Sequence, residues 1–307
     1  MDTSDRLISH EAQSGATLDA TIEATKARLR AAEPFPGATL DQQLALVDQL
    51  AQFELGRFLL VNRGLDAIWT HRLVTHEPGS LQLGQVPELE YLSFERLPAT
   101  CATRERFGIF RRELQALLKP GAVFASVPGG VMGDLLLLDY AQAPDVRLIG
   151  VDLDPNALDA ARALAEERGL AGRLSLRRAD AWEMDLHAEA DVLTSNGINL
   201  YEPDDERVVQ LYRKFFDALK PGGRLVTSFL TPPPSLSPDS PWDMSTTTPA
   251  LLGLQFLLFA RVIEAKWSSF RTHAQTREQL ERAGFTDVTF IDDSARMFPT
   301  VVARKPE

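Results

Sequence analysis

Hydrophobic residues recur along this chain with two different spacings, and the first hundred residues show the helical one. A clear apolar face at spacings of three and four is formed by Leu44, Val47, Ala51, Leu55 and Phe58. Similar patterns predict helices over residues 18–32, up to His76 and over 103–118, whereas 87–97 fits either a helix or an extended segment. Residues 1–15 are polar, and we expect them to fray. This part of the chain is therefore expected to be all helical.

From about residue 122 onward, short apolar runs alternate with helical segments. The runs are typical of buried parallel strands and cover residues 123–127, 148–151, 174–176 and 191–195, followed by "GGRLVTSFL", "TDVTFI" and "TVVAR" near the end. Between them, helices are predicted at 133–138, 156–169 and 205–219. Asp154 and Pro155 fit the N-cap and first position of the second of these helices. Alternating strands and helices predict a doubly wound α/β domain.

A segment between the later strands interrupts this alternation. "TPPPSLSPDSPWDMSTTTP" is rich in Pro, Ser and Thr and is predicted to be a loop, and a helix apolar on most sides follows at about 250–266. Such a helix must be buried, either inside the molecule or against a second copy of the chain. We expect an N-terminal helical region, residues 1–102, that serves as a substrate cap or dimer contact. A nucleotide-binding domain, residues 103–307, would carry an insertion at about 231–270, and the insertion and the N-terminal helices together could close the site.

The candidate binding chemistry begins with a Gly-rich turn after the first strand. Pro128, Gly129 and Gly130 break the strand, and the next strand ends in Asp152. A strand, a Gly-rich turn, a helix and a strand tipped by a carboxylate form a nucleotide-binding unit, since that carboxylate can accept both ribose hydroxyl protons. Because Asp154 is the predicted helix cap, Asp152 is the stronger ligand candidate.

Further motifs follow the third strand and the later strands, and their order along the chain resembles that of a known family. Asp180 follows the third strand, and an "LKPGG" strand is followed by "AGF" and two closing strands. From roughly residue 104 to 305, the chain resembles the class I S-adenosylmethionine (SAM)-dependent methyltransferases. This resemblance implies a seven-stranded sheet in the order 3-2-1-4-5-7-6 with the last strand antiparallel, and SAM as cofactor.

The resemblance also implies which residues contact the cofactor. They follow the first four strands and comprise Ser126, Pro128, Gly129, Gly130, Asp152, Leu153, Asp180, Ala181, Trp182, Asn196, Gly197 and Asn199. Ordinary roles remain open for several of them: a tight turn for the two glycines, and a turn-forming side chain for Asp180.

The first motif departs from the family pattern. Ser126 stands where the family has an acid, and Pro128 and Met132 stand where it has the first and third glycines. The contact to the methionine amino group would then come from Ser126, from a backbone carbonyl or from a helix residue outside the core.

Methyl transfer to a hydroxyl would be helped by a general base, for which the candidates are His71, His76, Tyr201 and His273. Each of them also fits a structural or surface role. No metal-binding spacing of histidines stands out, and Cys101 is the single cysteine, so no metal is predicted.

The amino-acid composition disfavours some classes of binding partner. A net charge of −11 and a pI near 5.0 argue against a general nucleic-acid or anionic-membrane surface. The start lacks a basic, apolar secretion signal and no apolar run is long enough to span a bilayer, so we expect a cytoplasmic location. The leading hypothesis is a SAM-dependent methyltransferase acting on a small molecule, with a homodimer as an open option. The alternatives are a SAM-binding protein that does not methylate and, less favoured, an NAD-dependent oxidoreductase.

Overall fold

The computed structural model describes residues 17–265 and 269–307, so the prediction for residues 1–15 lies outside it. The described chain forms two compact units. One contains the residues up to Arg104 together with a later segment that begins at Met244. The other contains Glu105–Asp243 and the residues from Ser269 onward that the structure describes. We refer to them as the helical unit and the sheet unit.

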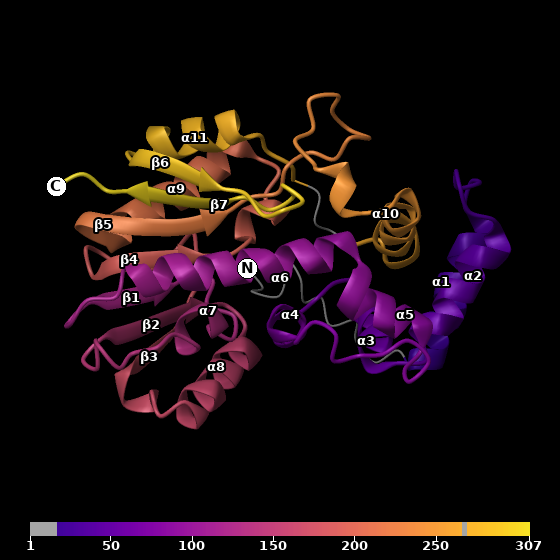
Figure 1. The fold of residues 1–307 in the computed structure, drawn as a ribbon, viewed down its shortest axis with the longest axis horizontal. Coiled ribbons are helices and arrows are strands. Elements are labelled where there is room, and N and C mark those ends of the chain that lie inside the picture. Colours follow the sequence, from indigo (N-terminus) through magenta and orange to yellow (C-terminus); the bar gives the residue numbers. More distant parts are fainter. Residues whose placement is uncertain (1–16, 266–268) are drawn as a thin grey trace. The chain divides into compact units, whose positions relative to one another are not determined.

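The sheet unit holds seven strands in one sheet (Figure 1). They are β1 (Val123–Ser126), β2 (Arg147–Asp152), β3 (Leu174–Arg178), β4 (Ala190–Ser195), β5 (Leu219–Ser228), β6 (Thr286–Ile291) and β7 (Thr300–Arg304). Their order is β3-β2-β1-β4-β5-β7-β6, and β7 runs antiparallel to both of its neighbours, while the first five strands are parallel. The predicted sheet is confirmed in strand order and direction.

Helices cover both faces of this sheet. On one face, Phe110 of α6 (Pro98–Ala116) and Leu135 of α7 (Gly133–Leu136) share a core with Ala161 of α8 (Pro155–Glu167) and the β1 residue Phe124. On the other face lie α9 (Asp205–Ala218) and α11 (His273–Arg282). Short 3-10 turns occur at Ala171–Arg173 and Ile198–Tyr201.

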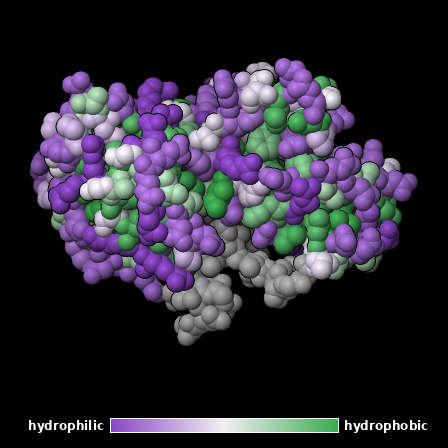
Figure 2. Space-filling view, turned by 90° about the horizontal axis from the view of Figure 1, so that it is seen from below, coloured by the Kyte–Doolittle hydropathy of each residue, from purple (hydrophilic) through white to green (hydrophobic). Residues whose placement is uncertain are grey.

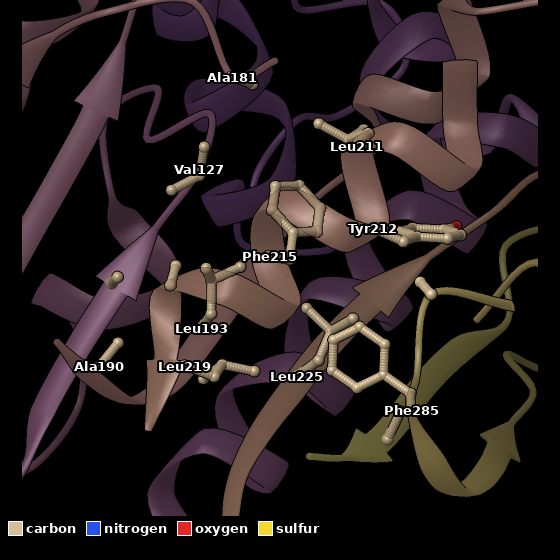
Figure 3. Packing of buried hydrophobic residues seen from close by; sticks show 14 of the residues in the cluster. Val127, Ala181, Ala190, Leu193, Leu211, Tyr212, Phe215, Leu219, Leu225 and Phe285 are labelled. Atoms are coloured by element: carbon tan, nitrogen blue, oxygen red, sulfur yellow. The ribbon is translucent and has the colours of Figure 1, made fainter. Parts of the chain in front are cut away.

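The buried face of α9 shows how apolar residues at helical spacing pack a helix against the sheet. Leu211, Tyr212 and Phe215 of α9 are fully buried in one cluster with the strand residues Leu193 and Leu225, and Phe215 lies next to Leu193 (Figure 3). Large apolar side chains of this kind each contribute about 1.5–3 kcal/mol on burial. The amphipathic spacing predicted for this helix is therefore what attaches it to the sheet.

Strand register places the ends of the parallel strands in rows. Ser126 of β1 pairs with Gly150 of β2 and with Thr194 of β4, so these three residues share a level of the sheet. Side chains alternate between faces along a strand, so the next positions on that same face are Asp152, Pro128, Asn196 and Ser228. Three of these four positions are polar, and they lie at the carboxyl edge of the sheet, where doubly wound folds bind their ligands.

The helical unit comprises the N-terminal helices and the later segment. Its elements are α1 (Leu18–Ala31), α2 (Leu40–Leu50), α3 (Glu54–Asn62), α4 (Ala67–Thr75), α5 (Glu88–Tyr91), the π-helix Leu92–Arg96, the 3-10 turn Met244–Thr246, α10 (Pro249–Phe256) and the π-helix Leu257–Ile263. Residues 88–96, which fitted two conformations in the sequence, are helical.

The predicted helix of the insertion packs with the N-terminal helices. Leu257, Leu258, Val262 and Ile263 lie in one core with Leu50 and other residues of the N-terminal helices. The predicted division near residue 102 counted this segment with the sheet domain, whereas in the structure it belongs to the helical unit. The later half of this apolar helix is thus covered within the chain, whereas Phe256 in its first half stays exposed.

Two arginines hold the end of this helix. Arg28 donates to the carbonyl oxygens of Val262 at 2.6 Å and Arg261 at 3.1 Å, and Arg63 donates to that of Ile263 at 3.2 Å. Both arginines also form ion pairs with Glu264. Because the last carbonyls of a helix have no partner within it, these contacts stabilise the segment where it ends.

The surface is mainly hydrophilic. Figure 2 shows one face on which hydrophilic side chains predominate and hydrophobic ones form small groups. The exposed large hydrophobic side chains are Leu40, Ile68, Leu83, Leu236, Met244 and Phe256. Within the described part of the chain, no helix is both long and apolar enough to cross a membrane.

Candidate functional site

The turn after β1 is fastened to the end of β2. The amide of Gly129 donates to the carbonyl of Val151 at 2.7 Å, and the amide of Gly130 donates to Oδ2 of Asp152 at 2.7 Å. Gly130 has φ of 52°, a conformation that favours glycine. The Gly-rich turn and the strand-end carboxylate, chosen separately from the sequence, therefore lie in direct contact.

The second oxygen of Asp152 faces the start of α8. Its Oδ1 accepts from the amide of Asp154 at 2.9 Å, while Asp154 itself accepts from the amide of Asn156 and caps α8, as predicted. A carboxylate offers about four acceptor sites, so these two amides leave Asp152 the capacity to accept hydroxyl protons as well. The geometry is compatible with its predicted role toward a ribose.

A buried carboxylate that the sequence analysis missed lies behind the turn. Oδ2 of Asp134, on α7, accepts from the hydroxyl of Thr194 at 2.9 Å, and Oδ1 accepts from the amide of Leu135 at 3.1 Å. Burial raises the pKa of the Asp134 carboxyl to about 6, although these hydrogen bonds oppose the rise. Thr194 pairs in register with Ser126, so the carboxylate is one strand away from the position at which the family pattern has its acid. Ser126 itself is buried at the end of β1.

The segment after β3 forms a compact turn. Oδ1 of Asp180 accepts from the amide of Trp182 at 2.9 Å, and the indole N–H of Trp182 donates to the carbonyl of Arg207 at 2.9 Å. The guanidinium carbon of Arg207 lies 5.3 Å from the centre of the indole ring. Ala181 is buried, and the carbonyl of Leu153 accepts from Nε of Arg178 at 3.2 Å. These contacts fix Trp182 as a partly exposed flat side chain beside Asp180.

The residues after β4 divide into two groups. Gly197 has φ of 90° and begins the turn Ile198–Tyr201, next to Asn196. Asn199 is buried, and its side-chain amide donates to Oη of Tyr212 and to the carbonyl of Ser228, both at 2.9 Å. The side chain of Asn199 therefore holds this turn to α9 and β5, and the geometry does not support the prediction that it contacts the cofactor.

The four candidate bases have different surroundings. In the helical unit, burial lowers the pKa of His71, while Nε2 of His76 lies 2.7 Å from Oε1 of Glu95. In the sheet unit, Nε2 of His273 lies 2.9 Å from Oδ1 of Asp292. Burial raises the pKa of Tyr201, which is the last residue of the turn that begins after Gly197.

Burial of Glu95 opposes its ionisation, but hydrogen bonds from the amides of Gly79 and Leu81 and from His76 lower its pKa to about 2. The His76–Glu95 pair is thus a satisfied structural contact of the helical unit. Among residues 17–265 and 269–307, no group of three or more His, Cys, Asp or Glu is arranged to hold a metal ion.

Comparison with known proteins identifies the domain in which this site lies. A family model described as a methyltransferase domain matches residues 131–223, which run from the turn after β1 into β5. The resemblance to the class I SAM-dependent methyltransferases is thereby confirmed, and the matched residues place a methyltransferase domain within the sheet unit. The cofactor of this domain is SAM.

A solved relative shows that the fold extends over nearly the whole chain. The crystal structure of a possible exported protein from Bordetella parapertussis shares 57% identity, covers 94% of this chain and 96% of its own, and superposes with a TM-score of 0.89. The chain therefore shares its fold with this protein along nearly its whole length.

Two curated relatives match shorter regions. Demethylmenaquinone methyltransferase from Thermus thermophilus is 35% identical over 33% of this chain, and erythromycin 3''-O-methyltransferase from Saccharopolyspora erythraea is 29% identical over 46%. The matched region spans 44% of the length of each relative, less than half. The similarity to these two relatives is therefore confined to part of each chain.

Proposed function

We propose that this protein transfers a methyl group from SAM to a small-molecule acceptor. The observation that carries the proposal is the hydrogen bond between the Asp152 carboxylate and the amide of Gly130, which joins the ribose-binding acid to the Gly-rich turn. Both curated relatives are methyltransferases whose names refer to small molecules, which supports an acceptor of that class. The −11 net charge favours the same conclusion over a nucleic-acid substrate.

The proposed cofactor site follows the carboxyl edge of the sheet. Asp152 would accept the ribose hydroxyls, Asp180 and the amide beside it would contact the adenine, and Trp182 would cover the base. Gly129 and Gly130 would allow close approach of the backbone, while Asn196 and Gly197 would border the acceptor. We assign Asp134 to the methionine amino group through its contact with Thr194, in place of the acid missing at Ser126.

The residues of the chain contribute mainly position. SAM supplies a methyl group already activated by the positive sulfonium, so in-line alignment of the acceptor is the main requirement, and alignment can contribute up to about 7–11 kcal/mol. For a hydroxyl acceptor we propose that Tyr201, which ends the turn after β4, orients the acceptor through a hydrogen bond. Because burial raises the pKa of its phenol, Tyr201 stays protonated, and the proton displaced from the acceptor passes to solvent. We retain a cytoplasmic location and a homodimer contact as proposals.

Calorimetric titration with SAM and S-adenosylhomocysteine tests the cofactor. We expect saturable binding of both, and release of S-adenosylhomocysteine during turnover with a panel of phenols, quinols and sugars. Absence of binding at millimolar ligand would refute the proposal. Asp159→Ala is a suitable control, because Asp159 lies exposed on α8 and pairs only with the neighbouring Arg162 among the described contacts.

A second candidate keeps the cofactor but omits methyl transfer. It is motivated by Ser126, which replaces the acid of the family motif, and it predicts SAM affinity without formation of S-adenosylhomocysteine on any acceptor. An NAD-dependent oxidoreductase is less favoured, and absorbance of bound nicotinamide would identify it.

A further inference from the structure

A buried arginine lies at the acceptor end of the proposed site. Arg106, on α6, has 5% of its surface exposed, and its Nη1 donates to Oγ of Ser228 at 3.3 Å. Its guanidinium carbon lies 5.0 Å from the centre of the Phe298 ring, and among the described residues its buried Nε has no hydrogen-bond partner. A guanidinium has five N–H donors, and the described residues give this one a single long hydrogen bond.

The residues that the structure describes place no close counterion beside the charge of Arg106. Over residues 17–265 and 269–307, no carboxylate oxygen lies within 4.0 Å of this guanidinium. Burial lowers its pKa to about 10, so it remains positively charged at neutral pH. Asp293 acts on it from farther away, and the Asp293 oxygens accept from the amides of Ala295, Met297 and Phe298 at 2.6–3.3 Å.

Ser228 connects Arg106 to the polar positions at the strand ends. Its hydroxyl donates to Oδ1 of Asn196 at 3.3 Å, which gives a chain of contacts from Arg106 through Ser228 to Asn196. Asp152, Asn196 and Ser228 lie on one face of the sheet. Because adjacent strands are about 4.8 Å apart, Ser228 is three strands, or roughly 14 Å, from Asp152. With the ribose held at Asp152 as proposed, that separation leaves Arg106 away from the sugar and on the side that we assign to the methyl acceptor.

We propose that Arg106 binds an anionic oxygen group of the methyl acceptor, such as a carboxylate, with Ser228 and Asn196 beside it. The inference rests on the proposed function and narrows its substrate class to small organic acids. An unpaired buried charge costs several kcal/mol, which packing against Phe298 alone does not offset. A planar guanidinium is the side chain best suited to pair with a carboxylate, since it can form two parallel hydrogen bonds.

Benzoate and benzamide test the charge preference, because they have similar shapes and differ in charge. Binding of each to the complex with S-adenosylhomocysteine would be measured by calorimetry at constant ionic strength, with inorganic phosphate as a further arm. We expect benzoate to bind at least about tenfold more tightly than benzamide, as expected for hydrogen bonds to a charged group. Equal affinity in the unaltered protein would overturn the inference without any variant, and a preference for phosphate over benzoate would overturn the carboxylate assignment.

Two variants on α6 test whether the preference for benzoate comes from Arg106. Arg106→Met removes the charge but keeps an apolar stem, and Arg112→Met does the same at an exposed position of α6. We expect Arg106→Met to abolish the benzoate preference and to leave affinity for S-adenosylhomocysteine within about twofold, while Arg112→Met changes neither. Persistence of the preference in Arg106→Met, or about a tenfold loss of cofactor affinity, would overturn the inference. Failure of the unaltered protein to bind SAM would instead refute the proposed function.

Discussion

Met132 occupies the space that the absence of a side chain at Gly150 leaves open. A Cβ atom added to Gly150 would collide with Sδ of Met132 and would lie 2.7 Å from Cδ2 of Leu176. Met132 is 1% exposed and has φ of 55°, and it stands where the family motif has its third glycine. In the family motif, the third glycine allows its helix to pack closely on the strand. In this chain Met132 stands at that position, and Gly150 on β2 provides the space for its side chain.

Gly150→Ala is therefore expected to destabilise the sheet unit. The added methyl group must displace Met132 or Leu176 within a packed layer, and overpacking of this kind costs about 1–3 kcal/mol. Urea unfolding, followed by circular dichroism, would measure the change. Gly172→Ala is the matched control, because nothing lies within 4 Å of a Cβ at that position.

The same pair offers a rescue. Met132→Ala alone should cost about 2–5 kcal/mol through loss of buried volume. In the double variant Met132→Ala with Gly150→Ala, the new methyl group occupies part of that volume, so the combined loss should be smaller than the sum of the two. Strict additivity would show that the two side chains do not compete for space.

Asp152→Ala is expected to weaken SAM binding by about 1.5–3 kcal/mol, the effect of losing charged hydrogen bonds. The substitution also removes the acceptor for the amides of Gly130 and Asp154, so the turn loses its attachment to β2. Calorimetry with S-adenosylhomocysteine, alongside a thermal melt, would separate lost affinity from lost folding. Unchanged affinity in a folded variant would mean that another residue holds the ribose, and Asp159→Ala should bind as the unaltered protein does.

The sheet could be predicted because its signals are local. Each parallel strand is a short apolar run ended by a turn, and Asp152 could be selected because Asp154 and Pro155 already explained the start of α8. Strand order followed from resemblance to a family, since apolar runs alone do not specify which strands pair. Contact between Asp152 and Gly130 needed only that β1 and β2 be neighbours.

The residues that sequence reasoning missed depend on tertiary burial. Asp134 appears in the sequence as an acid in the first turn of a helix, which is ordinarily a solvated position, and only its contact with Thr194 shows that it is enclosed. Arg106 adjoins the apolar residue Phe107 on α6, and long charged side chains usually extend to solvent there. Similarly, the insertion helix had a clear apolar surface, but periodicity contains no information about which helices cover it.

The insertion helix should contribute to the stability of the helical unit. Leu258→Ala removes a fully buried side chain from the core shared with the N-terminal helices, and such truncations cost about 2–5 kcal/mol. Phe256→Ala on the same segment is the control, since 60% of the Phe256 surface is exposed. Hydrogen exchange of amides in α1 to α3 would report the loss. Equal effects of the two substitutions would contradict this assignment of the helix.

Asp134 should make stability depend on pH in a specific direction. Its pKa of about 6 in the folded protein exceeds the ordinary 3.8, so the folded state holds the proton more tightly and stability falls as pH rises through that window. Asp134→Asn cannot ionise, and it should therefore be more stable than the unaltered protein by about 1–3 kcal/mol at pH 8, with a much smaller difference near pH 4. Urea unfolding at both pH values would measure this, with Asp217→Asn on the exposed side of α9 as control. A difference that stays constant between pH 4 and pH 8 would show that Asp134 is not buried as an acid, and its assignment to the cofactor amino group would lose its basis.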